Sequence, residues 1–230
     1  MNSNIETNRI PGPETNLVTL EEGISILIVG PPGAGKGTKA QLLAGIYPNG
    51  QHLGMSSILR YCEKNNLALL EGEEWKLKKR KLVSDHIVMN CLEYYLEVHS
   101  FTNEVLIFDG LPRTAEQAKE LIRLLQKQRP GRKIYSIELH IPTTVAIERA
   151  NQRREECLAR GEVPREDDTP ELAEQGSKEY FGLRPGVVDI LKVRSNFTSF
   201  SATGTHNVTF KFVTDKLGVT DHAYELGLFQ

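Results

Sequence analysis

The chain has little that would place it in a membrane, on nucleic acid or in an oxidising compartment. Its three cysteines, Cys62, Cys91 and Cys157, are odd in number and lack CxxC spacing, so we expect neither a disulfide framework nor a zinc site. The 28 basic and 30 acidic residues leave a net charge of −2, which gives no bulk attraction to nucleic acid or to an anionic membrane. Any anion must therefore bind at a local site.

Long hydrophobic runs are missing as well. None of the 230 residues belongs to an apolar stretch approaching the roughly 20 residues of a membrane-spanning helix, and the polar N-terminus is unlike a signal peptide. Residues 1–20 show no clear period, which predicts a flexible leader. We expect a cytoplasmic, monomeric protein with one domain at 21–230. The sequence assigns no role to the leader or to the tail at 218–230.

The segment Gly30–Thr38, reading GPPGAGKGT, follows the apolar run Ile24–Val29 and carries the clearest chemistry. Its glycines let the backbone bend tightly and turn several N–H groups toward one anion. The helix expected from about Thr38 to Ala44 adds its positive N-terminal end, and Lys36 supplies a mobile charge for the β and γ phosphates. The segment predicts a nucleotide phosphate site formed by Gly33, Ala34, Gly35, Lys36, Gly37 and Thr38.

Apolar runs alternate with helical patterns along the rest of the chain. Because parallel strands need crossover helices, this alternation predicts an α/β domain with a mostly parallel sheet covered on both faces. Two charged, helix-rich stretches, at about 56–96 and 150–180, are expected to lie outside the core. The expected strands are Ile24–Val29, Gln51–Gly54, Val105–Phe108, Ile134–Ile141 and Asn196–Ser201.

Asp109 directly follows the apolar run Val105–Phe108. In an open parallel sheet, ligands bind at this end of the strands. Beside a phosphate loop, the Asp109 carboxylate is positioned to hold the water shell of a Mg²⁺ ion that bridges two phosphates, with Thr38 as a second metal candidate.

Four motifs in consistent order resemble those of the adenylate kinase family of nucleoside monophosphate kinases. The loop GPPGAGKGT matches the variant of that family, with its threonine one place later than in the generic loop. DGLPRT at 109–114, followed by Gln117, differs from the family's DGFPRT only at Leu111. KLVSD at 81–85 and REDD at 165–168 resemble two further family motifs. The resemblance covers about Ile24 to Leu217.

The resemblance implies a P-loop NTPase-type three-layer sandwich with a five-stranded parallel sheet. It also implies a monophosphate-binding insertion at about 54–96, a short lid at about 154–165, and a cis bond between Leu111 and Pro112. The implied activity is transfer of the γ-phosphate of Mg·ATP to a nucleoside monophosphate, most simply AMP. Arginines suit this reaction because their planar forks grip phosphate oxygens.

On the acceptor side, Arg60 and Arg113 resemble the family's pair that clamps the monophosphate. Gln117 resembles the residue that reads the adenine edge, since an amide both donates and accepts. The substrate-binding candidates are Met55, Arg60, Lys81, Leu82, Val83, Gly110, Arg113, Gln117 and Arg165.

On the donor side, Arg149 and Arg153 resemble the pair at the start of the lid. Arg165 resembles the lid arginine that reaches the transferring group, and Arg154 and Arg160 are rivals because the alignment slides there. The donor-binding candidates outside the loop are Arg149, Arg153 and His206, and the catalytic candidates are Lys36, Arg113, Arg153 and Arg165.

The chain departs from the family pattern at two places. Met55, Ser56 and Ser57 stand where adenylate kinases have Thr, Gly and Asp. Gly176 stands where the family has a catalytic arginine, with Glu174 in place of a further basic residue. Three hypotheses therefore stay open: a working adenylate kinase-like enzyme, a kinase with another monophosphate preference, and a nucleotide-binding protein with weak or no transfer activity.

Overall fold

The computed structural model of the chain describes residues 23–73, 76, 81–101, 104–164 and 168–229. The expected leader at 1–20 and the candidate residue Arg165 lie outside the described residues. No helix in the described part of the chain is both long and apolar enough to cross a membrane.

The centre of the domain is a five-stranded sheet in which every pairing is parallel, with the strand order β2-β3-β1-β4-β5. This sheet confirms the expected fold class, and each predicted strand end lies within one residue of the observed one. The strands are β1 (Ser25–Val29), β2 (Gly50–Gly54), β3 (Val105–Asp109), β4 (Ile134–His140) and β5 (Asn196–Ser201).

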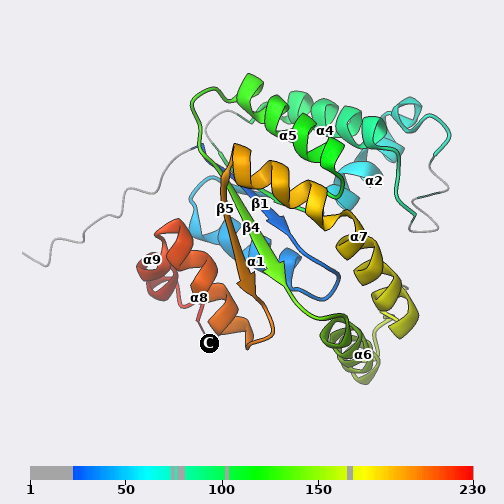
Figure 1. Cartoon of the computed structure of the whole chain (residues 1–230), viewed down its shortest axis with the longest axis vertical. Helices are drawn as coiled ribbons and strands as arrows, with labels where there is room; N and C mark the ends of the chain where they lie inside the picture. The colour runs from blue at the N-terminus through cyan, green and yellow to red at the C-terminus, as the bar shows by residue number, and fades with distance from the viewer. Residues whose placement is uncertain (1–22, 74–75, 77–80, 102–103, 165–167, 230) are drawn as a thin grey trace, which may run out of the picture.

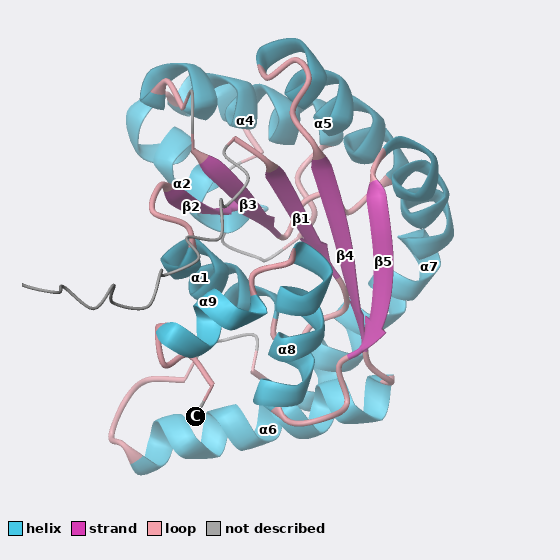
Figure 2. Ribbon diagram, turned by 90° about the vertical axis from the view of Figure 1, so that its left-hand side faces the viewer, coloured by secondary structure: helices cyan, strands magenta, loops and turns pink. Residues whose placement is uncertain are grey.

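Helices cover both faces of the sheet (Figures 1 and 2). One face carries α1 (Lys36–Ile46), α8 (His206–Leu217) and α9 (Thr220–Glu225), and the other carries α4 (Asp85–His99), α5 (Ala115–Gln128) and α7 (Pro170–Arg194). The remaining elements are α2 (Met55–Asn65), the short 3-10 helix η1 (Leu67–Leu70) and α6 (Thr143–Ala159).

The strands divide their apolar side chains between these two layers, because alternate residues of a strand point to opposite faces. In β1, Leu27 and Val29 join the core under α4, α5 and α7, whereas Ile26 and Ile28 join the core under α1, α8 and α9. Both faces of the sheet are therefore buried, which explains why the strands read as continuous apolar runs.

The stretch at 56–96 does not lie outside the core as expected. Ile87 and Leu92 of α4 are 1% and 0% exposed and pack in the same core as Leu59 of α2. The prediction was wrong because it weighed overall charge, whereas an amphipathic helix buries one apolar face whatever its opposite face carries.

The strand order reverses beside β1. The connection after β1 leads outward to β2 on one side of the sheet, whereas the connection after β3 crosses to β4 on the other. A crevice therefore opens at the carboxyl ends of β1 and β3, the place where open α/β sheets bind ligands. Gly30–Thr38 follows β1 there, and Asp109 is the last residue of β3.

Candidate active site

The phosphate loop bends through glycines at the positions that require them. Gly33 and Gly35 have φ angles of 76° and 79°, in the left-handed region that side chains with a Cβ rarely adopt. Gly35 is also the N-cap residue of α1. The loop therefore delivers its backbone directly onto the positive end of α1, as an anion site requires.

Lys36 is the first residue of α1, and its Nζ donates a hydrogen bond to the carbonyl oxygen of Pro31 at 2.9 Å. Burial lowers the pKa of Lys36 to about 8; the Asp109 carboxylate opposes this shift, and Arg113 and Arg153 add to it. Lys36 therefore shares one electrostatic environment with groups from β3, from the loop before α5 and from α6. An anion bound among these cations would favour the charged form of Lys36.

Asp109 lies at the edge of the same crevice. Its Oδ2 is 3.7 Å from Nε2 of His52, and a Cβ built on Gly37 would lie 3.1 Å from that oxygen. Burial alone would raise the pKa of Asp109, but the neighbouring imidazole of His52 and the charge of Lys36 hold the pKa below its ordinary value. Asp109 is therefore a carboxylate at neutral pH, close to the start of α1.

These groups fit the Mg²⁺ ion that the sequence predicts. Magnesium is commonly held by one or two protein oxygens together with phosphate oxygens and water, so a dedicated cluster of side chains is not required. The described residues contain no group of three or more His, Cys, Asp or Glu side chains able to hold a metal. Asp109 beside the phosphate loop is nevertheless a suitable donor.

A cavity of about 600 Å³ extends from the phosphate loop to α2, a size typical of pockets for small ligands. It brings together ten of the predicted site residues, which come from separate parts of the chain. They are Gly33, Met55, Arg60, Lys81, Leu82, Val83, Gly110, Arg113, Gln117 and Arg153. Ser56 also lines the cavity, as do Glu63 and Glu179, two carboxylates that the sequence did not single out.

The arginine and amide expected on the acceptor side are held by one network. Nε of Arg113 donates to the Gly110 carbonyl oxygen at 3.1 Å, and the Arg113 N–H donates to Oε1 of Gln117 at 2.8 Å. Nε2 of Gln117 donates to Oδ1 of Asp85 at 2.8 Å, and the Thr114 hydroxyl donates to Oδ2 at 2.7 Å. Asp85, quoted above only as part of a motif, therefore orients the amide of Gln117.

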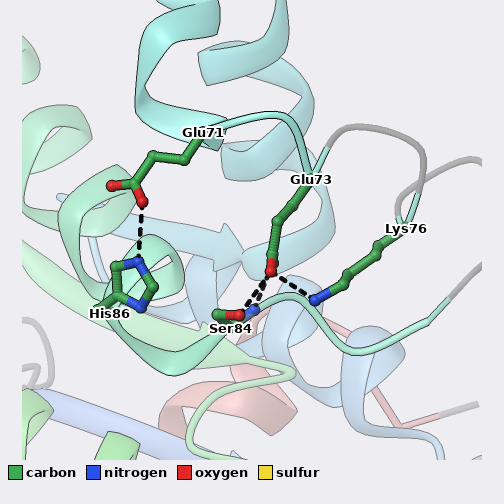
Figure 3. A network of polar contacts seen from close by, with 5 residues as sticks. All are labelled: Glu71, Glu73, Lys76, Ser84 and His86. Carbon is green, nitrogen blue, oxygen red and sulfur yellow. Dashed lines mark hydrogen bonds and ion pairs between the residues drawn. The ribbon is translucent and has the colours of Figure 1, made fainter.

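A second network holds the segment Lys81–Val83, which lines the cavity (Figure 3). Oε2 of Glu73 accepts from the Ser84 N–H at 2.8 Å, and Oε1 accepts from the Ser84 hydroxyl at 2.6 Å. Oε1 also accepts from Nζ of Lys76 at 2.5 Å. Nearby, Nε2 of His86 lies 3.1 Å from Oε2 of Glu71. Glu73 therefore fixes the residue immediately after the cavity-lining segment.

A second, smaller cavity lies beside Lys36. The donor-side candidates Arg149 and His206 line neither of the two cavities. Arg149 donates to the Gly33 carbonyl oxygen at 3.1 Å and to the Ala202 carbonyl oxygen at 2.8 Å. It thereby ties the phosphate loop to the segment after β5. Nδ1 of His206 lies 3.3 Å from Nζ of Lys39, a residue that the sequence analysis did not select.

At the start of the expected lid, the structure separates the rival arginines. Arg153 lines the larger cavity, and its guanidinium forms two hydrogen bonds with the buried carboxylate of Asp168, one of them 2.8 Å long. Arg160 is exposed and pairs with Glu162 at 3.1 Å. Arg154 is exposed and does not line the cavity. Helix α6 continues to Ala159, so the first half of the expected lid is helical.

Gly176 of α7 lies beside Pro32 of the phosphate loop. It lines both the larger cavity and the smaller one, of about 130 Å³, between Lys36, Arg113 and α7. Lys178, the cation two positions further along α7, is 72% exposed and pairs with Glu174 at 2.7 Å. It does not line either cavity and so does not replace the missing arginine.

A buried ionic group below the smaller cavity was missed by the sequence analysis. Glu138 of β4 is 0% exposed and accepts hydrogen bonds from the Tyr180 hydroxyl at 2.6 Å and from Nη2 of Arg184 at 2.8 Å. A glutamate within an apolar strand was the available signal, because a buried carboxylate needs partners. This group fixes α7 against the sheet.

Comparison with known proteins agrees with these motifs. The family model described as adenylate kinase matches residues 28–196. The adenylate kinase of Nitrobacter winogradskyi is 35% identical over 164 residues, which cover 69% of this chain and 75% of that protein. The adenylate kinase of Deinococcus radiodurans is 29% identical over 201 residues, covering 87% and 92%. The Leu111–Pro112 bond is cis, as the resemblance implied. The chain therefore belongs to the adenylate kinase family and is a nucleotide phosphotransferase.

Proposed function

We propose that the protein transfers the γ-phosphate of Mg·ATP to AMP, forming two molecules of ADP. The observation that supports this proposal best is the cavity of about 600 Å³, which reaches from Gly33 of the phosphate loop to Arg60 and Arg113. One space thus brings the phosphate-loop backbone together with two side chains suited to gripping phosphate. Phosphoryl transfer needs this arrangement, because its main requirements are positioning and charge neutralisation.

On the donor side, the loop from Gly33 to Thr38 would bind the triphosphate, with Lys36 on its β and γ phosphates. Asp109, with Thr38, would hold Mg²⁺, which when bound neutralises charge on the phosphate oxygens. Arg149 and His206 would border the donor nucleotide. Arg153 extends from α6 into the cavity and would contact the group in transfer, and Asp168 keeps its fork in place.

On the acceptor side, Arg60 and Arg113 would clamp the monophosphate, and Lys81–Val83 would line its base and sugar. Gln117 is the proposed adenine reader. Its amide has a fixed orientation, because Asp85 accepts from Nε2 and the Arg113 N–H donates to Oε1. The second hydrogen of Nε2 and the second lone pair of Oε1 stay available for a base edge.

A kinase with another monophosphate preference is the second candidate, and Met55 favours it. Met55 is 4% exposed, lines the cavity and lies close to Arg113, since the Cβ position of Gly110 is 3.9 Å from the Met55 Cβ and 3.6 Å from Nη2 of Arg113. A flexible apolar side chain therefore occupies the place where the family resemblance expects a threonine hydroxyl.

Weak or absent transfer is the third candidate, and Gly176 favours it. The described site contains no cationic side chain at this position of α7, beside the smaller cavity at Lys36. Loss of a phosphate-gripping arginine can lower a transfer rate by several powers of ten. The retained Lys36, Arg113 and Arg153 argue for the first candidate.

One experiment separates the three candidates. The purified protein is incubated with Mg·ATP and, in turn, with AMP, CMP, UMP and GMP, and the diphosphates are quantified. We expect AMP to give the fastest turnover. Preferential use of a pyrimidine would favour the second candidate. Tight ATP binding without turnover of any monophosphate would contradict both catalytic candidates.

A further inference from the structure

Lys39 is a buried lysine that the proposed reaction does not yet use. It lies in the first turn of α1, directly after Thr38, and is 4% exposed. Lysine is almost never fully buried unless its ammonium is paired, because removing a charge from water is costly. A residue at this position therefore needs a partner that carries negative charge.

The surroundings of Lys39 do not provide one. Its Nζ contacts Nδ1 of His206 at 3.3 Å, and within the described part of the chain it forms no ion pair with a carboxylate. The formal charge that acts on it is the guanidinium of Arg149, which has the same sign. The positive end of α1 lies beside it as well. The local field thus favours binding of an anion.

The phosphate loop brings an anion within reach. A Cβ built on Gly35 would lie 3.0 Å from Nζ of Lys39, so the ammonium lies beside the loop backbone. Lys36 lines the smaller cavity and interacts electrostatically with Asp109, Arg113 and Arg153. Lys39 contacts His206 and interacts electrostatically with Arg149, and it lines neither cavity. The two lysines therefore approach the loop among different neighbours.

We infer that Lys39 is a second phosphate-contacting lysine, which binds the polyphosphate of the donor nucleotide on the side away from the transferring group. This inference rests on the proposed donor site. Because Lys39 would contact phosphates that are the same in the ground and transition states, it would contribute to donor affinity far more than to turnover.

The test compares Lys39→Met with Lys211→Met. Methionine fills a similar volume without charge, and Lys211 is a half-exposed lysine of α8 that pairs with Asp215 away from the site. Calorimetric titration with ATP, inorganic tripolyphosphate and AMP should show roughly tenfold or greater weakening for the first two in Lys39→Met, with AMP affinity unchanged. Lys211→Met should bind all three like the original protein.

Two outcomes would overturn the inference. ATP and tripolyphosphate affinities within twofold of the original in Lys39→Met would show that the ammonium does not contact phosphate. Equal weakening of ATP, tripolyphosphate and AMP, together with a lower melting temperature, would assign Lys39 a structural role. Binding is measured without turnover, so failure of the proposed reaction would leave this test intact, and failure of this test would leave the reaction intact.

Discussion

A Cβ atom on Gly176 would lie 2.7 Å from Cγ of Pro32, closer than such atoms approach in proteins. Helix α7 and the phosphate loop thus meet at a contact that only glycine permits without movement. The position that lacks an arginine is therefore one where the helix packs tightly against the loop.

Substituting this glycine should cost stability. We expect Gly176→Ala to lower the free energy of unfolding by about 1–3 kcal/mol, because an added methyl group overpacks the contact with Pro32. Gly182→Ala is the matched control in the same helix, since its Cβ would meet no atom within 4 Å. The control should gain up to about 1 kcal/mol from helix propensity. Equal gains for both variants in denaturant titrations would contradict the close contact.

For the same reason, Gly176→Arg should not raise the transfer activity of the enzyme. The longer side chain meets the same clash at its Cβ, so the phosphate loop or α7 must shift. We expect weaker ATP binding and a lower melting temperature, measured by calorimetry and thermal scanning. A variant with higher turnover and unchanged stability would show that the site accommodates the side chain.

Substitution of Lys36 should lower the transfer activity without lowering the stability of the fold. We expect Lys36→Met to lower kcat/KM for transfer by about 100-fold or more, because a preorganised cation is lost from the phosphate site. The melting temperature should not fall, since the substitution removes a charge whose burial lowers its pKa to about 8. Unfolding of Lys36→Met at room temperature would contradict this prediction.

Glu73, which lies outside the cavity, should titrate at low pH and support monophosphate binding through its contact with Ser84. The hydrogen bonds from Lys76 and Ser84 lower the pKa of Glu73 from 4.5 to about 2. Because this pKa is lowered in the folded protein, the ionised Glu73 carboxylate stabilises the fold fully above pH 4.5, and this stabilisation is lost as the pH falls toward 2. Carboxyl NMR titration should find an apparent pKa for Glu73 well below those of the other glutamates that no hydrogen bond holds.

Loss of the Glu73 carboxylate should change the KM of only one substrate, the monophosphate. Glu73→Gln should raise the KM for the monophosphate several-fold, because Ser84 anchors the segment that lines the cavity, and should leave the KM for ATP unchanged. Glu71→Gln, which removes only the contact with His86, is the control (Figure 3). The prediction fails if the two variants behave alike.

Arg153 and Arg154 are neighbours that should differ sharply. Arg153→Met should lower transfer by about 100-fold or more and destabilise the fold by about 1–3 kcal/mol, because Asp168, only 2% exposed, loses its partner. Arg154→Met should leave both quantities nearly unchanged. Steady-state kinetics and denaturant titration on both variants test this, and an Arg154→Met variant with the larger loss would reverse the assignment.

The architecture was predictable from the sequence because its signals are local. The strand Asn196–Ser201 was predicted with the observed bounds, and GPPGAGKGT identified the phosphate loop from consecutive residues. Arg60, Arg113 and Gln117, which come from separate motifs, line one cavity, and their roles in binding stay predictions.

The partners of these residues were not predictable, because they come from distant parts of the chain. Asp85 meets Gln117 across 32 positions, and Arg153 meets Asp168 across 15. Pro32 and Gly176, which lie close together in the structure, belong to two separate segments that share no sequence motif. Overall charge also misled the prediction for 56–96, since the side of α4 that packs against α5 is apolar.

The direct pairing of β1 with β3 fixes the distance between the strand that leads into the phosphate loop and the strand that ends in Asp109. Ile28 is in register with Asp109, so one interstrand spacing of about 4.8 Å separates the strand that leads into the phosphate loop from the strand that carries the carboxylate. Backbone hydrogen bonds in the middle of a buried sheet are among the last to open. We therefore expect the separation between the start of the phosphate loop and Asp109 to stay the same when substrates bind.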